Sequence, residues 1–136
     1  NGQLFTKGFF NDDELNGEGI LYRENGKMWE KGIFKDGYLD GEGKKYDENG
    51  NIWQEGTFEN DELNGEGKVY YENGKIHLEG TFKDGNIIEG KVYYKNGEIA
   101  EGIFKDDYLI KGTTYRKNGK IEGIFKDGVL IDIKQF

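Results

Sequence analysis

Three kinds of side chain in this sequence could do chemistry: carboxylates, one imidazole and a set of aromatic rings. Carboxylates recur at Glu18, Glu42 and Glu66, in the same local context each time. A pair of carboxylates could hydrolyse a glycosidic bond, but recurrence at equivalent positions favours a solvated face. The chain has no serine or cysteine, and we interpret His77, its only histidine, as a packing or surface residue. We therefore predict a protein that is not an enzyme, with no catalytic residue and no cofactor.

Acidic stretches could supply the oxygen ligands of a hard cation. Residues 11–14 read Asn-Asp-Asp-Glu, and residues 60–62 read Asn-Asp-Glu. Neither stretch has the spacing of an EF-hand or the Gly-Gly-x-Gly-x-Asp pattern of calcium-binding repeats. We interpret both as solvated turns and predict no metal ligand.

Composition and charge narrow the class of partner. The 136 residues carry 27 acidic and 19 scattered basic side chains, for a net charge of −8. Nucleic-acid binding requires a basic face, and anionic lipid surfaces repel a chain of this charge, so we expect neither partner. Only 34% of the residues are apolar, yet 9 Phe, 9 Tyr and 2 Trp argue against disorder. The absence of cysteine excludes disulfides and thiolate metal sites.

The elements that position these side chains follow from an internal repeat. Gly-x-Phe begins successive units, and the first glycines are separated by 24, 24, 24, 22 and 21 residues. These glycines are Gly8, Gly32, Gly56, Gly80, Gly102 and Gly123. A tyrosine keeps the same period. The whole chain is therefore predicted to be one array of similar units.

Two turn signals divide each unit into two strands. Asn-Gly can supply the two positive φ angles of a type I′ turn, and Lys-Asp-Gly or Asn-Asp marks the second turn. The flanking residues are rich in Tyr, Val, Ile, Phe and Thr, which favour strands. We predict an all-β fold, an elongated single-layer antiparallel β-meander of tandem β-hairpin repeats of about 22–24 residues. The Asn-Gly pairs are Asn1-Gly2, Asn25-Gly26, Asn49-Gly50, Asn73-Gly74, Asn96-Gly97 and Asn118-Gly119.

One face of this sheet should carry a structural ladder of rings. Alternation places the phenylalanines on the face of the repeat glycines, and we expect the tyrosines beside them on neighbouring strands, as cross-strand aromatic pairs. The glycines would leave room for a ring to lie over the backbone. The ladder comprises Phe34, Phe58, Phe82, Phe104, Phe125, Tyr22, Tyr46, Tyr70, Tyr93 and Tyr115.

A second aromatic series varies between repeats and is the candidate binding site. It lies three residues after the Asn-Gly glycines and gives way to Ala100 and Glu122 in the later units. Phe34 follows Trp29 by five residues, an odd offset, so alternation predicts that the series occupies the face opposite the phenylalanines. Leu21, Val69 and Val92 should share that opposite face. The predicted partner-binding residues are Phe5, Trp29, Trp53, His77, Tyr71 and Tyr94.

The glycine pattern resembles that of a known repeat family. Residues 32–43, GIFKDGYLDGEG, contain Gly-x-Phe, then x-x-Gly, then Gly-x-Gly. Two units place Asp13 and Asp61 at the first turn glycine, and later units keep one late glycine, at Gly90 and Gly112. This pattern resembles the MORN repeat, and Asn-Gly preceded by Tyr is similar to bacterial MORN repeat variants, some of which are labelled antitoxin-like. The resemblance implies an elongated sheet used as a scaffold or binding surface, without catalysis.

A second, shorter resemblance supplies the alternative. Residues 69–75, VYYENGK, are similar to the Tyr-Tyr-x-x-x-Gly-Lys core of choline- and glucan-binding cell-wall repeats. Those repeats carry Gly-Trp for aromatic cages, where this chain has Gly-x-Phe. The function we predict is a scaffold that binds a protein through an aromatic face or an exposed strand edge, which could also pair two copies. The alternative is a carbohydrate- or choline-binding surface module.

The ends of the array are also informative. Gly2 precedes Gly8 by six residues, the same separation as between Gly26 and Gly32. The chain thus begins at a hairpin tip, and we expect it to be a fragment of a longer protein, which favours an exported or cell-envelope location over a cytoplasmic one. We predict a single array over residues 1–136, with a partial repeat at 1–7 and a terminal cap at about 123–136.

Overall fold

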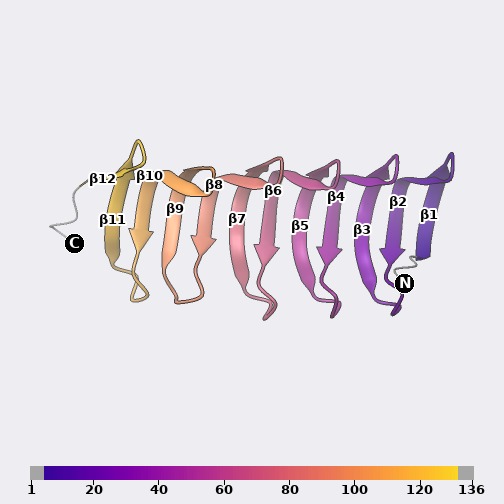
Figure 1. The fold of residues 1–136 in the computed structure, drawn as a ribbon, viewed down its shortest axis with the longest axis horizontal. Helices are drawn as coiled ribbons and strands as arrows, with labels where there is room; N and C mark the ends of the chain where they lie inside the picture. The colour runs from indigo at the N-terminus through magenta and orange to yellow at the C-terminus, as the bar shows by residue number, and fades with distance from the viewer. Residues whose placement is uncertain (1–4, 132–136) are drawn as a thin grey trace.

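The computed structural model describes residues 5–131, with only the backbone of Phe5, and it is built entirely of strands. Twelve antiparallel strands form one open sheet in which the spatial order is the chain order (Figure 1), so the predicted all-β meander is confirmed. The strands are β1 (Phe5–Asn11), β2 (Glu14–Tyr22), β3 (Met28–Lys35), β4 (Tyr38–Tyr46), β5 (Ile52–Glu59), β6 (Glu62–Tyr70), β7 (Ile76–Lys83), β8 (Asn86–Tyr93), β9 (Ile99–Lys105), β10 (Tyr108–Tyr115), β11 (Ile121–Lys126) and β12 (Val129–Leu130). The partial repeat at 1–7 and the terminal cap extend beyond the described residues.

Each repeat has two turns of different type. The sequence predicted a type I′ turn at Asn-Gly, but the type I′ turn is the other one. At the Asn-Gly turns, Asn25 keeps a negative φ, and only Gly26 is positive, at +86°. The Gly26 N–H donates to the carbonyl of Arg23, and Arg23 N–H donates to the carbonyl of Lys27, which describes a type I turn followed by a left-handed glycine. The Asn-Gly prediction was therefore wrong in turn type, because a three-residue loop needs one positive φ and not two.

Type I′ turns occur instead at the opposite end of the strands. Asp36 and Gly37 have φ of +51° and +85°, and the two-residue loop joins β3 to β4. In three of the described turns both central residues are Asn or Asp, as at Asn60 and Asp61, with φ of +49° and +70°. Asn and Asp tolerate this conformation better than other non-glycine residues. The acidic stretches are thus turn-forming residues.

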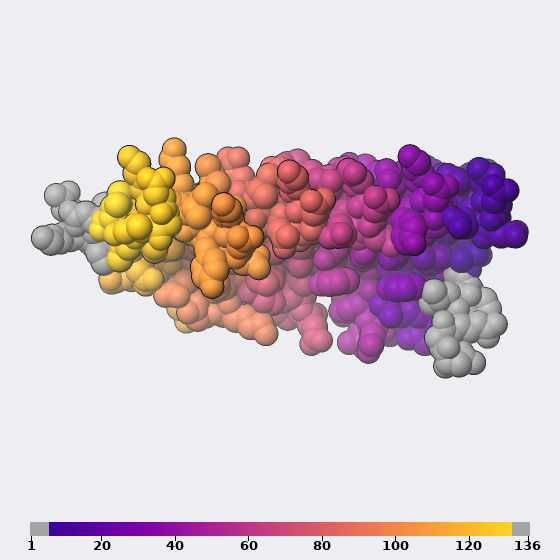
Figure 2. All heavy atoms as spheres, turned by 45° about the horizontal axis from the view of Figure 1, so that its top comes forward, coloured from indigo at the N-terminus to yellow at the C-terminus, as the bar shows by residue number. Residues whose placement is uncertain are grey.

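The array is elongated because each strand pairs only with its neighbours in the chain. Figure 2 shows the colours following one another in sequence order along the long axis. Adjacent repeats are also linked through their type I′ turns, where Asp61 N–H donates to the carbonyl of Leu39 at 3.0 Å and Gly85 N–H to that of Leu63 at 2.9 Å. Stability should therefore accumulate from contacts between neighbouring repeats.

The core lies on one face, near the type I′ turns, where the strands bend over (Figure 1). Phenylalanines of the predicted ladder pair across strands with leucines, as Phe58 does with Leu63. A β-carbon on Gly67 would lie 2.8 Å from Cδ2 of Leu63, so the leucine occupies the space above this glycine. We expected a ring in that space, and the structure places a leucine there. The core residues are Leu15, Phe34, Leu39, Phe58, Leu63, Phe82, Ile87, Val92, Ala100 and Phe104.

Candidate binding face

The tyrosine ladder lies on the face opposite the phenylalanines, contrary to the sequence prediction. The Tyr70 hydroxyl donates to the Glu55 carboxylate, and Tyr93 donates to Glu79 at 2.5 Å. Glu55 and Glu79 each precede a core phenylalanine by three residues, so they point to the other side of the sheet. Burial raises the pKa of Tyr70 to about 12, and the hydrogen bond to Glu79 raises the pKa of Tyr93 to about 12. The tyrosines therefore remain neutral donors to these carboxylates.

A β-bulge places the variable aromatic series on the phenylalanine face. Between β6 and β7, Tyr70 pairs with Ile76 while Val69 pairs with Leu78, so His77 is an extra residue on its strand. The equivalent shift in three other hairpins makes Trp29, Trp53 and Glu122 the extra residues. An extra residue in a strand reverses the face to which the residues on one side of it would otherwise be assigned by simple alternation.

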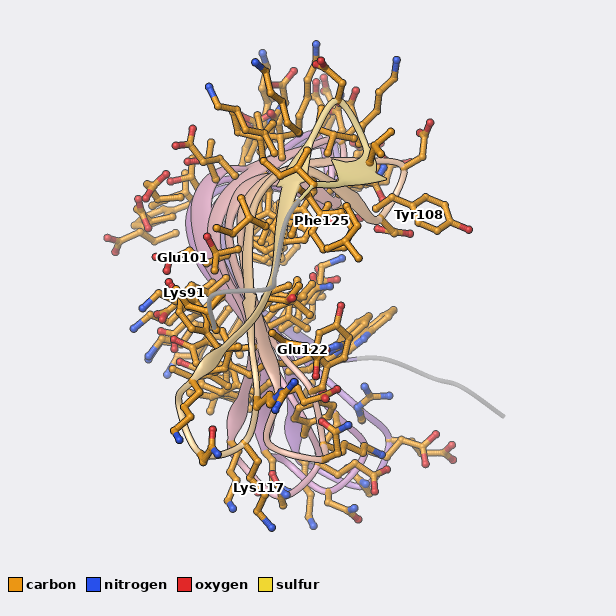
Figure 3. The ribbon with its side chains drawn as sticks, turned by 90° about the vertical axis from the view of Figure 1, so that its left-hand side faces the viewer. Lys91, Glu101, Tyr108, Lys117, Glu122 and Phe125 are labelled. Carbon is orange, nitrogen blue, oxygen red and sulfur yellow. The ribbon has the colours of Figure 1, made fainter. Side chains whose placement is uncertain are left out.

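The end-on view shows the result of this reversal. In Figure 3, Glu122 lies on the same side of the sheet as Phe125, and Lys91 and Glu101 lie on the other side. The prediction that the aromatic series occupies the face opposite the phenylalanines was therefore wrong. Leu21 and Val69 do share a face with that series, but it is the face of the core, against which both pack.

The bulge residues share a face of the sheet with the residues that follow the ladder tyrosines. Tyr71 stacks on His77, with ring centroids 4.3 Å apart, and its hydroxyl donates to the carbonyl of Tyr93 at 2.6 Å. Arg23 repeats this arrangement two units earlier in the array. Its guanidinium lies 5.5 Å from the centroid of Trp29, and its Nη2 donates to the carbonyl of Tyr46 at 2.9 Å. We call Arg23, Trp29, Trp53, Tyr71, His77 and Tyr94 the aromatic strip.

The strip is only partly covered by the chain itself. Trp53 and Tyr94 are 45% and 48% exposed, whereas Trp29, Tyr71 and His77 are half-buried. Lys95 places its ammonium 5.4 Å from the centroid of the Tyr71 ring. Burial and this ammonium both lower the pKa of His77, so the imidazole is neutral near pH 7 and acts as a stacked ring.

The structure places five of the six predicted site residues on one face of the sheet, two of them stacked on each other, and adds two others. The side chain of Phe5 lies outside the described residues. Sequence reasoning missed Arg23 and Lys95. Arg23 belongs to a variable column, the position after each ladder tyrosine, whereas Lys95 lies one residue beyond that column. The column is occupied by Arg23, Asp47, Tyr71, Tyr94 and Arg116. Aligning the repeats on the tyrosine would have revealed that column.

Comparison with known proteins decides the family. A profile of the MORN repeat variant matches three consecutive units, residues 15–36, 39–60 and 63–84. The chain belongs to the MORN repeat family. Each matched segment runs from the buried leucine at the start of an even-numbered strand to the next type I′ turn, so the sequence unit coincides with the structural repeat. No curated protein gives a significant match to the sequence.

MORN repeats form binding modules and are generally thought to mediate protein or membrane-lipid interactions. Within the described part of this MORN array, no three carboxylate, imidazole or thiol side chains gather as a metal site. Nor do residues 5–131 contain a helix of the length and hydrophobicity that crossing a bilayer requires.

The face opposite the aromatic strip carries a shallow groove of about 690 Å³ above the glycine row. Its walls alternate in charge, with Lys44 next to Glu55 and Lys68 next to Glu79 on adjacent strands. Because the two signs are interspersed, the groove does not favour a ligand of one charge.

A buried carboxyl lies between the core and the strip of the MORN array. Glu30 is 5% exposed, and its Oε2 lies 3.9 Å from the Lys45 ammonium. Burial, and next the charge of Asp61, raise the pKa of Glu30 from 4.5 to about 7, against the opposing effects of Lys45 and Arg23. Later repeats place apolar Leu78 and Ala100 in this row.

We expect Glu30→Gln to change the pH dependence of stability. Because the folded pKa is raised, the carboxyl contributes fully below the unfolded pKa of 4.5, and this contribution is lost as pH rises through about 7. The wild-type protein should therefore lose about 2–3 kcal/mol of unfolding free energy between acid and mildly alkaline pH, and the glutamine variant should not show this loss. Urea titrations at both pH values measure the change, with the exposed Glu18→Gln as control. A difference between variant and wild type that stays constant with pH would contradict the assignment.

Proposed function

We propose that this MORN array is a non-enzymatic scaffold that binds another protein through the aromatic strip. The observation that carries the proposal is that the bulges turn Trp29, Trp53 and His77 onto one face with Tyr71 and Tyr94. Half-exposed Trp and Tyr side chains are typical anchors of protein interfaces. Their attachment to a continuous sheet fixes their spacing and reduces the entropy lost on binding.

The environment of the rings favours a protein over a sugar or a choline headgroup. A sugar ring or a quaternary ammonium binds to uncovered aromatic faces. Here Arg23 lies over Trp29, and His77 and Lys95 lie against Tyr71. A protein partner can instead pack apolar side chains against Trp53 and Tyr94 and bring carboxylates to Arg23 and Lys95.

The test compares Trp53→Ala with Tyr108→Ala in capture from lysate and envelope extract of the native source. Tyr108 is 75% exposed but lies near the type I′ turns, away from the strip (Figure 3). We expect wild type and Tyr108→Ala to bind the same protein, and Trp53→Ala to bind that purified protein about tenfold or more weakly. Circular dichroism should show that both variants fold.

Equal affinity of all three proteins for the captured partner would place the binding site elsewhere. The carbohydrate- or choline-binding alternative is tested by titrating wall glycan and choline while following tryptophan fluorescence. Saturable binding of either ligand that Trp53→Ala abolishes, without any captured protein, would replace the proposal by that alternative.

A further inference from the structure

The five Asn-Gly pairs within the described residues share a reactive chemistry that the binding function does not use. In such a pair, the glycine backbone nitrogen can lose its proton and attack Cγ of the asparagine. The side-chain nitrogen then leaves as ammonia, and a five-membered succinimide remains. Water opens this ring at either carbonyl and gives aspartate or isoaspartate, so the net change consumes one water and releases one ammonia. All five asparagines are exposed: Asn25, Asn49, Asn73, Asn96 and Asn118.

Four of the five side chains are held by a hydrogen bond that the reaction must break. Oδ1 of Asn25, Asn73, Asn96 and Asn118 accepts the backbone N–H two residues later, at 2.9 Å in each case. That bond fixes the position of Cγ and resists its movement onto the glycine nitrogen. The glycine N–H itself does not distinguish the sites, because in all five turns it donates to the carbonyl three residues earlier, at 2.8–3.0 Å.

Asn49 differs because the side chain of Asp47, and not that of Asn49, accepts the backbone hydrogen bonds within this turn. Oδ1 of Asp47 accepts from the N–H groups of both Asn49 and Asn51, at 2.9 and 3.0 Å. Among the described residues, no hydrogen bond to the Asn49 side chain is formed. Its Cγ can therefore reach the Gly50 nitrogen without breaking a hydrogen bond of the Asn49 side chain.

A second feature at Asn49 assists loss of the glycine proton. The Lys27 ammonium donates to the backbone carbonyl oxygen of Asn49 at 3.0 Å. This oxygen belongs to the same amide as the Gly50 nitrogen, so it carries much of the negative charge when that nitrogen is deprotonated. A charge-assisted hydrogen bond stabilises that anion. At the other four turns, no lysine ammonium in the described part of the chain donates to the equivalent oxygen.

We infer that Asn49-Gly50 is a site of spontaneous succinimide formation and deamidation, selected among five chemically similar pairs by the fold, with the Lys27 ammonium stabilising the deprotonated amide. The missing hydrogen bond accounts for about a fivefold increase in rate, and the lysine adds about a further twofold. The product places a new carboxylate beside the Lys27 ammonium and, in the isoaspartate form, lengthens the backbone of the turn.

Peptide mapping by mass spectrometry of the folded protein, incubated at mildly alkaline pH, tests the inference. Asn49 should convert about tenfold faster than Asn25 or Asn73. The same incubation in denaturant should bring the five rates together. Lys27→Met should slow conversion at Asn49 about twofold and leave Asn118 unchanged.

Three results would overturn the inference. They are a rate at Asn25 or Asn73 equal to that at Asn49 in the folded protein, the same ranking in denaturant, and no effect of Lys27→Met. Asp47→Ala provides a further check, because it removes the acceptor that replaces the Asn49 side chain. This variant frees the N–H of Asn51 for the Asn49 side chain, the bond that the other four asparagines form, so conversion at Asn49 should slow toward the rate at Asn73.

Discussion

Alanine at Gly56 is expected to destabilise the array by roughly 3–5 kcal/mol, a large share of the stability of a domain of this size. A β-carbon at this position would lie 2.3 Å from the carbonyl oxygen of Glu66 and 2.6 Å from Cα of Gly67. Both atoms are backbone of the paired strand, so they cannot move without opening the ladder. Gly56 also has a φ of +144°, which L side chains rarely adopt.

The matched control for Gly56→Ala is Gly74→Ala. Gly74 also has a positive φ, of +86°, but a β-carbon there meets nothing within 4 Å. Its replacement should cost about 1–2 kcal/mol, from backbone conformation alone. Urea unfolding followed by circular dichroism gives both free energies. Equal costs at the two positions would show that the strands can separate at Gly56, against the close approach described here.

Phe58→Ala is expected to cost about 3–5 kcal/mol. The ring is 2% exposed, pairs across strands with Gly41 and Leu63, and has the Lys45 ammonium 5.7 Å from its centroid. Because the sheet has a single layer, no second sheet can move in to fill the space that the ring leaves. The remaining cavity should keep the cost near the upper part of the range.

Tyr108→Ala serves again as the control for Phe58→Ala, since it removes a ring that is 75% exposed. We expect it to change the unfolding free energy by at most about 0.5 kcal/mol. Hydrogen exchange adds a second readout: Phe58→Ala should lower protection most in β4, β5 and β6, because contacts run only between neighbouring repeats. A uniform loss of protection over all strands would indicate that the array unfolds as one unit.

The period of the sequence was enough to predict the fold class and the strand order. Gly-x-Phe and the tyrosine spacing place two strands in every unit, and neighbouring strands in a meander have no alternative partners. The burial of Phe34, Phe58 and Phe82 followed from the same alternation. Resemblance to the MORN repeat pointed to the same architecture.

The face of the candidate site could not be predicted, because it depends on one residue per hairpin. Alternation assigns Trp53 to the side opposite Phe58, and the bulge reverses this assignment. No residue type marks the bulge, since Trp29, Trp53, His77 and Glu122 all occupy it. The hairpin of β8 and β9 lacks the shift, and there Ala100 pairs directly with Val92. The length of each hairpin is therefore the only sequence signal of the bulge.

Burial of Glu30 was also beyond sequence reasoning. A glutamate in a charged surface strand gives no sign of it, and the signal lies in the repeats that follow. Gln54 and Leu78 occupy the same row of the sheet, which becomes apolar toward β9. A column that changes from carboxyl to amide to alkyl indicates a half-buried position, where a carboxyl is retained only at an energetic cost.

Strictly sequential pairing of the strands has a mechanical consequence. The long axis of the sheet runs along the inter-strand hydrogen bonds, so tension applied between the two ends loads the strand pairs in series. Every pair then bears the same force, and the pair with the fewest bonds separates first. In the described residues that pair is β11 and β12, where Phe125 pairs with Leu130 and Lys126 with Val129, and the N–H of Ile131, just after β12, donates to the carbonyl of Ile124. Under load the array should therefore lengthen in steps, as one hairpin after another separates from the end of the sheet. The repeats that remain paired keep their structure.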